Sequence, residues 1–196
     1  MELVSEAIIF ATKAHDGMRR KKSEQPYILH PVEAAAIAGS ITTNQEIIAA
    51  AALHDVVEDA GIAIEEIRES FGERVAGLVL SETENKREKL PAEETWEIRK
   101  RESIKILSET KDIGVKILYL SDKLANLRSI YNELGKEGNI FWKRFNQKDP
   151  SKQEWYYRSI VANTKELSGT LAWKEFNGLI ESVFVTGKFD QKENSI

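Results

Sequence analysis

The sequence contains no cysteine among its 196 residues. Disulfide bonds, thiolate nucleophiles and cysteine-based zinc sites are therefore excluded, and a bound metal must take its ligands from His, Asp or Glu side chains. Histidine is also scarce, because the chain has only His15, His30 and His54. A metal site built on imidazole nitrogens consequently has few possible members.

Long apolar segments and positive net charge are lacking as well. The longest uninterrupted apolar run is residues 47–53, far shorter than the ~20 residues that cross a membrane. Glu2 and Glu6 lie where a signal peptide would carry positive charge. The net charge of −4 argues against binding along nucleic-acid phosphates. We therefore expect a cytoplasmic protein whose partner is neither a membrane nor a nucleic acid.

What the sequence does contain is helical periodicity. Apolar residues recur at spacings of three and four, whereas strand-like alternation never persists. The pattern predicts helices over residues 3–15, 31–39, 44–55, 62–71, 75–79, 96–107 and 114–134, and two more between 151 and 185. The charge-dense residues 82–94 are expected to form a surface loop, and the aromatic residues of 141–157 to pack in the core. The predicted fold class is all-α, with about ten helices.

The candidate chemistry begins in residues 51–59, AALHDVVED. His54 closes an apolar run, Asp55 follows it directly, and Glu58 and Asp59 arrive three and four residues later. If this segment is helical, the three carboxylates project from one side, because such positions are neighbours on a helix surface. This is a pattern for binding a metal and a water molecule; the alternative for Glu58 and Asp59 is a solvated acidic turn.

A second source of ligands is Asp122, which lies inside an otherwise apolar helical segment. Aspartate is rarely buried without a partner. Lys123 or Arg128 could supply that partner through an ion pair, and a metal ion is the alternative. Asn126, one turn along, faces the same way as Asp122.

His30 has two interpretations that the sequence leaves open. It could cap the helix that begins at Pro31, or it could be a metal ligand. His15, which lies where the predicted helix 3–15 ends and a loop begins, is interpreted as structural.

Taken together, four side chains could form one ligand set: His30, His54, Asp55 and Asp122. Two imidazoles and two carboxylates suit a borderline or hard divalent cation and leave positions open for water or substrate. Such an ion lowers the pKa of water and polarises phosphoryl oxygens, and nearby acidic groups could orient or deprotonate the water. The consecutive cations at 19–22 could neutralise a polyphosphate. The combination predicts phosphoester hydrolysis.

Four ordered blocks of this sequence resemble the HD-domain hydrolases of guanosine tetraphosphate, and more closely the small alarmone hydrolases, which include a metazoan homologue of SpoT. The blocks are HDGMRRKKSEQPYILHP, AALHDVVED, FGERVAGLVLSETENKREKLP and LYLSDKLANLR. The resemblance implies a single HD-type hydrolase domain over residues 1–196, with a core of about 1–170, a C-terminal helix at 171–186 and a flexible tail at 187–196. Two positions depart from the family pattern: Met18, where a Gln is usual, and Ala125.

The resemblance also implies roles for individual residues. It places one manganese ion at His30, His54, Asp55 and Asp122, and it makes Glu58 and Asp59 the groups that act on the attacking water. The residues implied to bind the guanine nucleotide are Arg20, Lys21, Asn126 and Lys86, with Arg99 or Lys100 as further phosphate contacts.

The reaction that the resemblance implies is release of pyrophosphate from the 3′ position of ppGpp or pppGpp, which leaves GDP or GTP. Two alternatives stay open. The same site could remove the 2′-phosphate of NADPH or act on another nucleotide, or the protein could be a nucleotide sensor that does not hydrolyse its ligand.

Overall fold

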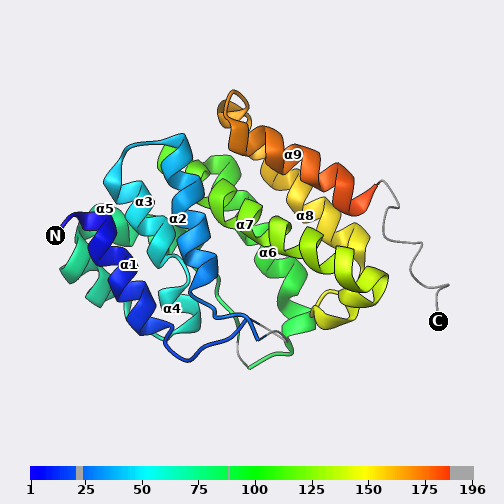
Figure 1. Cartoon of the computed structure of the whole chain (residues 1–196), viewed down its shortest axis with the longest axis horizontal. Coiled ribbons are helices and arrows are strands. Elements are labelled where there is room, and N and C mark those ends of the chain that lie inside the picture. The colour runs from blue at the N-terminus through cyan, green and yellow to red at the C-terminus, as the bar shows by residue number, and fades with distance from the viewer. Residues whose placement is uncertain (21–23, 88, 186–196) are drawn as a thin grey trace.

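The periodicity of the sequence is realised as helices throughout the described chain (Figure 1). The computed structural model describes residues 1–20, 24–87 and 89–185. Within these ranges the only β-type pairing is one isolated bridge between Arg19 and Pro26, so the all-α prediction is confirmed. The α-helices of the described chain are α1 (Leu3–Ala14), α2 (Leu29–Ile41), α3 (Gln45–Leu53), α4 (Val56–Asp59), α5 (Ile64–Glu82), α6 (Ala92–Glu109), α7 (Ile113–Glu137), α8 (Pro150–Asn163) and α9 (Leu171–Phe184), with short 3₁₀ helices at Gly138–Arg144 and Lys165–Leu167.

Alanine allows three helices to approach closely around α3. Residues 49–53 of α3 are fully buried. α3 packs against α1 and α2, which contribute the fully buried Ala7, Ala11, Ala34 and Ala38. Small side chains on all three helices bring the backbones together and leave no free volume. The C-terminal end of α3, where His54 lies, is therefore held firmly in the core.

α7 lies at the centre of the molecule (Figure 1) and packs against α2, α3, α5, α6, α8 and α9. The side chain of Asp112 caps its first turn by accepting a hydrogen bond from the Gly114 N–H at 2.8 Å. Every residue from 114 to 122 is buried, because neighbouring helices surround this half of α7. Asp122 is thereby placed in the interior.

The helix boundaries at two candidate ligands, His30 and His54, differ from the prediction. α2 begins at Leu29 with Ile28 as its N-cap, so the interpretation of His30 as a cap is wrong: His30 lies in the first turn. α3 ends at Leu53, and the chain turns at His54 and Asp55 before the single turn of α4. This break allows Val56 to be fully buried in the core, and Asp55 is not on a continuous helix with the preceding residues.

The expected packing of the aromatic C-terminal segment is confirmed. Phe141, Trp142, Tyr156 and Tyr157 are buried, and the ring of Trp142 stacks on that of Phe184 with centroids 5.6 Å apart. The predicted C-terminal helix is α9, which ends at Phe184, and the tail 187–196 lies outside the described residues. No described helix is long and apolar enough to cross a bilayer.

Candidate functional site

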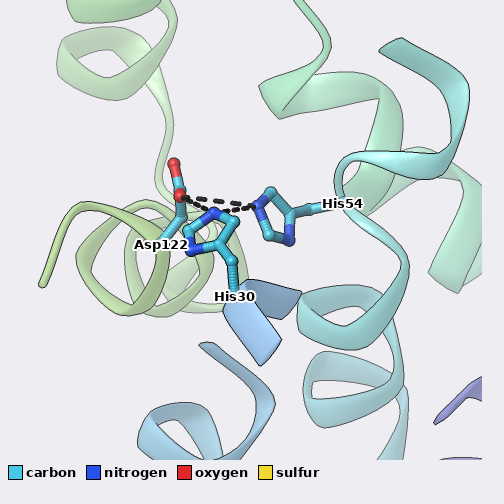
Figure 2. Close-up of side chains that lie close together, drawn as sticks. All are labelled: His30, His54 and Asp122. Atoms are coloured by element: carbon cyan, nitrogen blue, oxygen red, sulfur yellow. Dashed lines mark hydrogen bonds and ion pairs between the residues drawn. The ribbon is translucent and has the colours of Figure 1, made fainter. Parts of the chain in front are cut away.

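Three side chains from distant parts of the sequence converge in the interior (Figure 2). His30 comes from the first turn of α2, His54 from the C-terminal end of α3 and Asp122 from the middle of α7. The Nε2 atom of His30 lies 2.9 Å from Asp122 Oδ1 and 3.2 Å from His54 Nε2. One potential ligand atom from each residue lies within 4.8 Å of the others, and all three residues are buried.

The orientation of His54 is fixed by a backbone hydrogen bond. Its Nδ1 atom donates to the carbonyl oxygen of Ala51 at 2.8 Å, so the lone pair of the neutral imidazole is on Nε2, which faces His30 and Asp122. Hydrogen bonding of the second ring nitrogen is how proteins orient histidine ligands. Two imidazole nitrogens and a carboxylate oxygen that face one point are a suitable donor set for a divalent cation. The three residues fit a metal site.

Asp55 lies at the edge of this group. Its Oδ2 atom is 3.2 Å from His54 Nε2 and 3.5 Å from His30 Nε2. The three-residue cluster His30, His54 and Asp122 does not include it. Of the four predicted ligands, three therefore form one tight group and the fourth directs an oxygen toward it.

Burial and mutual proximity shift the pKa values of these groups in opposite directions. Burial lowers the pKa of His30. Burial also acts to lower the pKa of His54, but Asp55 and Asp122 outweigh it and raise this pKa. For Asp122 burial acts to raise the pKa, whereas Lys123 and the two imidazoles lower it well below the usual range. Asp122 is consequently an ionised carboxylate, the form that binds metals.

Glu58 and Asp59, on α4, are held beside the metal cluster by the segment that follows α5. Lys86 Nζ donates to Asp59 Oδ1 at 2.6 Å and to the Glu58 carbonyl oxygen at 2.7 Å. The Glu84 N–H donates to Glu58 Oε2 at 3.2 Å. Burial, followed by the charges of Asp55 and Glu84, raises the pKa of Glu58. Both acidic residues therefore have hydrogen-bond partners in the segment after α5, although Asp59 is exposed.

The hydroxyl of Tyr27 was not anticipated as part of the site. It lies 2.7 Å from Asp55 Oδ2 and 2.6 Å from Asp59 Oδ2. Its contact with residues 28 and 32 positions away arises from the fold, and no local pattern could have revealed it.

Buried ion pairs lie beside the metal cluster, and among them the sequence had offered only the pair of Lys123 with Asp122. Lys123 contacts Asp122 and lies 3.1 Å from Glu82 Oε1. Glu84 accepts hydrogen bonds of 2.7 Å from both Arg99 and Lys100. Arg128, the other proposed partner of Asp122, instead bonds Glu33 and Glu175. The charge density of residues 82–94 had indicated a surface loop, but α5 extends to Glu82 and buries it.

A cavity of about 610 Å³ opens beside Asp59, Lys123 and Asn126. Five of its lining side chains are cationic and two are carboxylates. The cations are Arg19, Arg20, Lys100, Lys123 and Arg144. Aromatic rings form much of the remaining wall, contributed by Tyr27, Trp96, Phe141, Phe145, Tyr156 and Tyr157. This is a cavity suited to an anionic, planar ligand.

Arg20 connects this cavity to the metal cluster. Its guanidinium donates to Asn126 Oδ1 at 2.9 Å, and the Asn126 amide donates to Asp122 Oδ1 at 2.6 Å. A second cavity of about 540 Å³ is lined by Arg20 and His30 among others. Lys21, the remaining predicted nucleotide contact, lies outside the described residues.

The family comparison agrees with this site. The model of the HD domain matches residues 7–144. A guanosine-3′,5′-bis(diphosphate) 3′-pyrophosphohydrolase of Aquifex aeolicus is 38% identical over 130 residues, which are 66% of this chain and 18% of that protein. A GTP pyrophosphokinase of Myxococcus xanthus is 32% identical over 132 residues, 66% of this chain and 17% of that protein. The chain thus spans less than a fifth of these curated relatives.

Solved structures cover more of the chain. A metazoan orthologue of SpoT that hydrolyses ppGpp superposes with a TM-score of 0.72 at 26% identity, over 93% of this chain and 96% of that one. The protein lmo0812 of Listeria monocytogenes superposes with a TM-score of 0.69 at 32% identity, over 79% of this chain and 98% of that one.

Proposed function

Since the chain belongs to the HD-domain family, we propose that it is a metal-dependent 3′-pyrophosphohydrolase that converts ppGpp and pppGpp to GDP and GTP. The observation that carries this proposal is the buried His30–His54–Asp122 cluster, which Asn126 joins by a hydrogen bond to a cationic, aromatic-lined cavity. A pyrophosphohydrolase among the similar proteins and the likeness to a ppGpp-hydrolysing orthologue of SpoT support the choice of substrate.

We propose that His30, His54, Asp55 and Asp122 hold one divalent cation, Mn²⁺. The donor set of imidazole nitrogen and carboxylate oxygen suits this ion, while the absence of cysteine leaves no thiolate that would favour softer metals. A bound divalent cation supplies positive charge that polarises a phosphoryl oxygen and acidifies water.

Glu58 and Asp59 are the groups assigned to the attacking water. Hydrolysis joins the water oxygen to phosphorus, breaks the ester bond to the ribose 3′-oxygen and returns a proton to that oxygen. The raised pKa of Glu58, caused by burial and by Asp55 and Glu84, brings this carboxylate closer to the proton affinity that a general base needs near neutral pH. Asp59 lines the cavity and is held on both carboxylate oxygens.

The nucleotide is assigned to the cavity of about 610 Å³. Arg20 offers a planar guanidinium for the base or the phosphates, and Asn126 lies beside it. Lys86, which does not line this cavity, bonds Glu58 and Asp59 and is proposed as a further phosphate contact. Lys21 is proposed as a further contact.

The test is to incubate the purified protein with ppGpp and, separately, with NADPH, and to measure released pyrophosphate against released phosphate. Wild-type protein with Mn²⁺ is expected to release pyrophosphate from ppGpp. The variants His54→Ala and Asp55→Ala are expected to lose at least about 100-fold in kcat, since each removes a ligand-set member. Chelation should abolish turnover until Mn²⁺ is returned.

Three outcomes contradict the proposal in distinguishable ways. Full activity in either variant would show that the reaction does not depend on the proposed metal site. Release of phosphate from NADPH, with ppGpp intact, would show that the same site acts on a different nucleotide. Tight binding of ppGpp with no product after hours in Mn²⁺ would indicate a sensor.

A further inference from the structure

One tyrosine hydroxyl lies between a candidate metal ligand and a candidate catalytic carboxylate. Tyr27 Oη is 2.7 Å from Asp55 Oδ2 and 2.6 Å from Asp59 Oδ2. These three residues come from three different segments: the turn before α2, the turn after α3, and α4. Both contacts are as short as strong O–H···O hydrogen bonds.

Backbone hydrogen bonds and ring contacts hold Tyr27 in place. The Tyr27 N–H donates to the Met18 carbonyl at 3.0 Å, and the Tyr27 carbonyl accepts from the His30 N–H at 3.0 Å. The Tyr27 ring packs on the ring of His15, with centroids 4.8 Å apart. The Arg20 guanidinium lies over the Tyr27 ring, 5.7 Å from its centroid.

A phenolic hydroxyl has one hydrogen and can donate to only one of the two carboxylates at a time. Asp55 Oδ2 is the oxygen that faces His30 and His54, whereas Asp59 Oδ2 has no part in that cluster. A carboxylate whose charge is neutralised by a cation accepts a weaker hydrogen bond than a free carboxylate. Once a cation neutralises the charge of Asp55, Asp59 is the better acceptor for the hydrogen of the Tyr27 hydroxyl.

We propose that Tyr27 is a positioning residue that donates its hydroxyl hydrogen to Asp59 and holds this carboxylate toward the reacting water. The inference rests on the proposed function, because it assigns Asp59 to the hydrolytic step. Lys86 holds the opposite oxygen, Asp59 Oδ1, at 2.6 Å. Asp59 is thus fixed at both oxygens, and removal of the Tyr27 hydroxyl leaves it held at one.

The test is the variant Tyr27→Phe, which keeps the ring and removes the hydrogen bond. Its kcat for ppGpp is expected to fall about 10- to 100-fold, the range found when a supporting hydrogen bond at a metal site is lost. KM for ppGpp should stay within about threefold, because the hydroxyl orients the carboxylate and does not bind the nucleotide. Calorimetric titration of the metal-free protein with Mn²⁺ should give the same affinity as wild type within about threefold.

Two further variants separate positioning from a general structural effect. Tyr119→Phe is the matched control. The hydroxyl of Tyr119 donates a hydrogen bond to the Ser81 carbonyl at 3.0 Å, and Tyr119 is not among the proposed metal ligands, catalytic groups or nucleotide contacts. Its kcat should equal that of wild type. The double variant Tyr27→Phe with Asp59→Asn should be no slower than Asp59→Asn alone, since residues that act through one another are not additive.

The contrary results are equally definite. An unchanged kcat in Tyr27→Phe, or additive losses in the double variant, would overturn the inference. Weaker Mn²⁺ binding with full kcat at saturating Mn²⁺ would assign the hydroxyl to Asp55 instead. If wild-type protein hydrolyses no nucleotide, the proposed function fails and this inference fails with it, whereas hydrolysis by wild type with an unchanged kcat in Tyr27→Phe overturns this inference alone.

Discussion

Individual charged residues around the metal cluster are buried together with their counter-charges. Glu84 shows this clearly: its side chain is 9% exposed and bonds Arg99 and Lys100 from α6. Burial acts to raise the pKa of Glu84, but Lys100, Lys123 and Arg99 outweigh it and lower the pKa from 4.5 to about 2. The backbone N–H of Glu84 also donates to Glu58 on α4. The buried ion pairs of Glu84 with Arg99 and Lys100 therefore hold the segment that supports α4.

The lowered pKa of Glu84 makes a pH-dependent contribution to stability. A carboxylate with a lower pKa in the folded state stabilises that state fully above its unfolded pKa, and the effect is lost as pH falls from 4.5 toward about 2. Glu84→Gln should lower the free energy of unfolding at pH 7 by about 3 kcal/mol. The difference from wild type should fall to less than half by about pH 3, measured by urea unfolding at each pH.

Glu97→Gln provides the control for this prediction. Glu97 also has two cationic partners, Arg101 and Lys152, but its side chain is 42% exposed. Water screens such pairs, so this substitution should change the free energy of unfolding little at any pH. Equal losses in the two variants would show that burial does not set the contribution of Glu84.

At the level of single elements, α5 is divided by Gly72. The sequence predicted two short helices on either side of this residue, and the structure has one kinked helix in which Gly72 has φ 88° and ψ 167°. A Cβ atom at this position would meet nothing within 4 Å, so only the backbone conformation requires glycine. The kink reorients the second half of α5, which ends at Glu82 beside Lys123.

Substitution of two glycines in α5 by alanine should therefore have opposite effects. Gly72→Ala should destabilise the protein by about 1–3 kcal/mol, because this φ and ψ combination is essentially restricted to glycine. Gly77→Ala should stabilise it by up to about 1 kcal/mol, since Gly77 is helical and its Cβ would also lie in open space. Urea unfolding of both variants checks the signs. A loss in Gly77→Ala equal to that in Gly72→Ala would contradict the backbone explanation.

For the whole molecule, the candidate metal centre joins parts of the chain that are distant in sequence. His30, His54 and Asp122 belong to α2, the end of α3 and α7, and α2 and α3 both pack against α7. An ion held by all three can bind only when these helices are assembled. Metal binding should consequently be coupled to the stability of the complete fold.

The coupling predicts a metal-dependent melting temperature. Free Mn²⁺ at 100 times its Kd should add about 2.7 kcal/mol of stability, which raises Tm by roughly 5–10 °C for a domain of this size. Differential scanning calorimetry with Mn²⁺ and then with a chelator measures the shift. Asp122→Asn should abolish it, whereas Asp112→Asn, a substitution at the cap of the same helix, should lower the baseline Tm and retain it. No shift in wild type would exclude the cluster as a metal site.

The sequence alone determined the features that depend on local pattern. The period of apolar residues specified the all-α class, because each helix buries one face or all of its surface independently of its neighbours' identity. The lack of cysteine limited the possible ligands, and Asp122 was recognisable because a charge in an apolar helix requires a partner. Residue types also suggested His30 and Asp55 as ligands, whereas the role of Asn126 as a nucleotide contact relied on family resemblance.

Only the tertiary structure decided which side chains meet. The contact of Tyr27 with both Asp55 and Asp59, the burial of Glu84 by α6 and the link from Arg20 through Asn126 to Asp122 each join segments far apart in the chain. These contacts depend on how the helices pack around α7. Helical periodicity shows which face of a helix is buried, but it does not show what that face will touch.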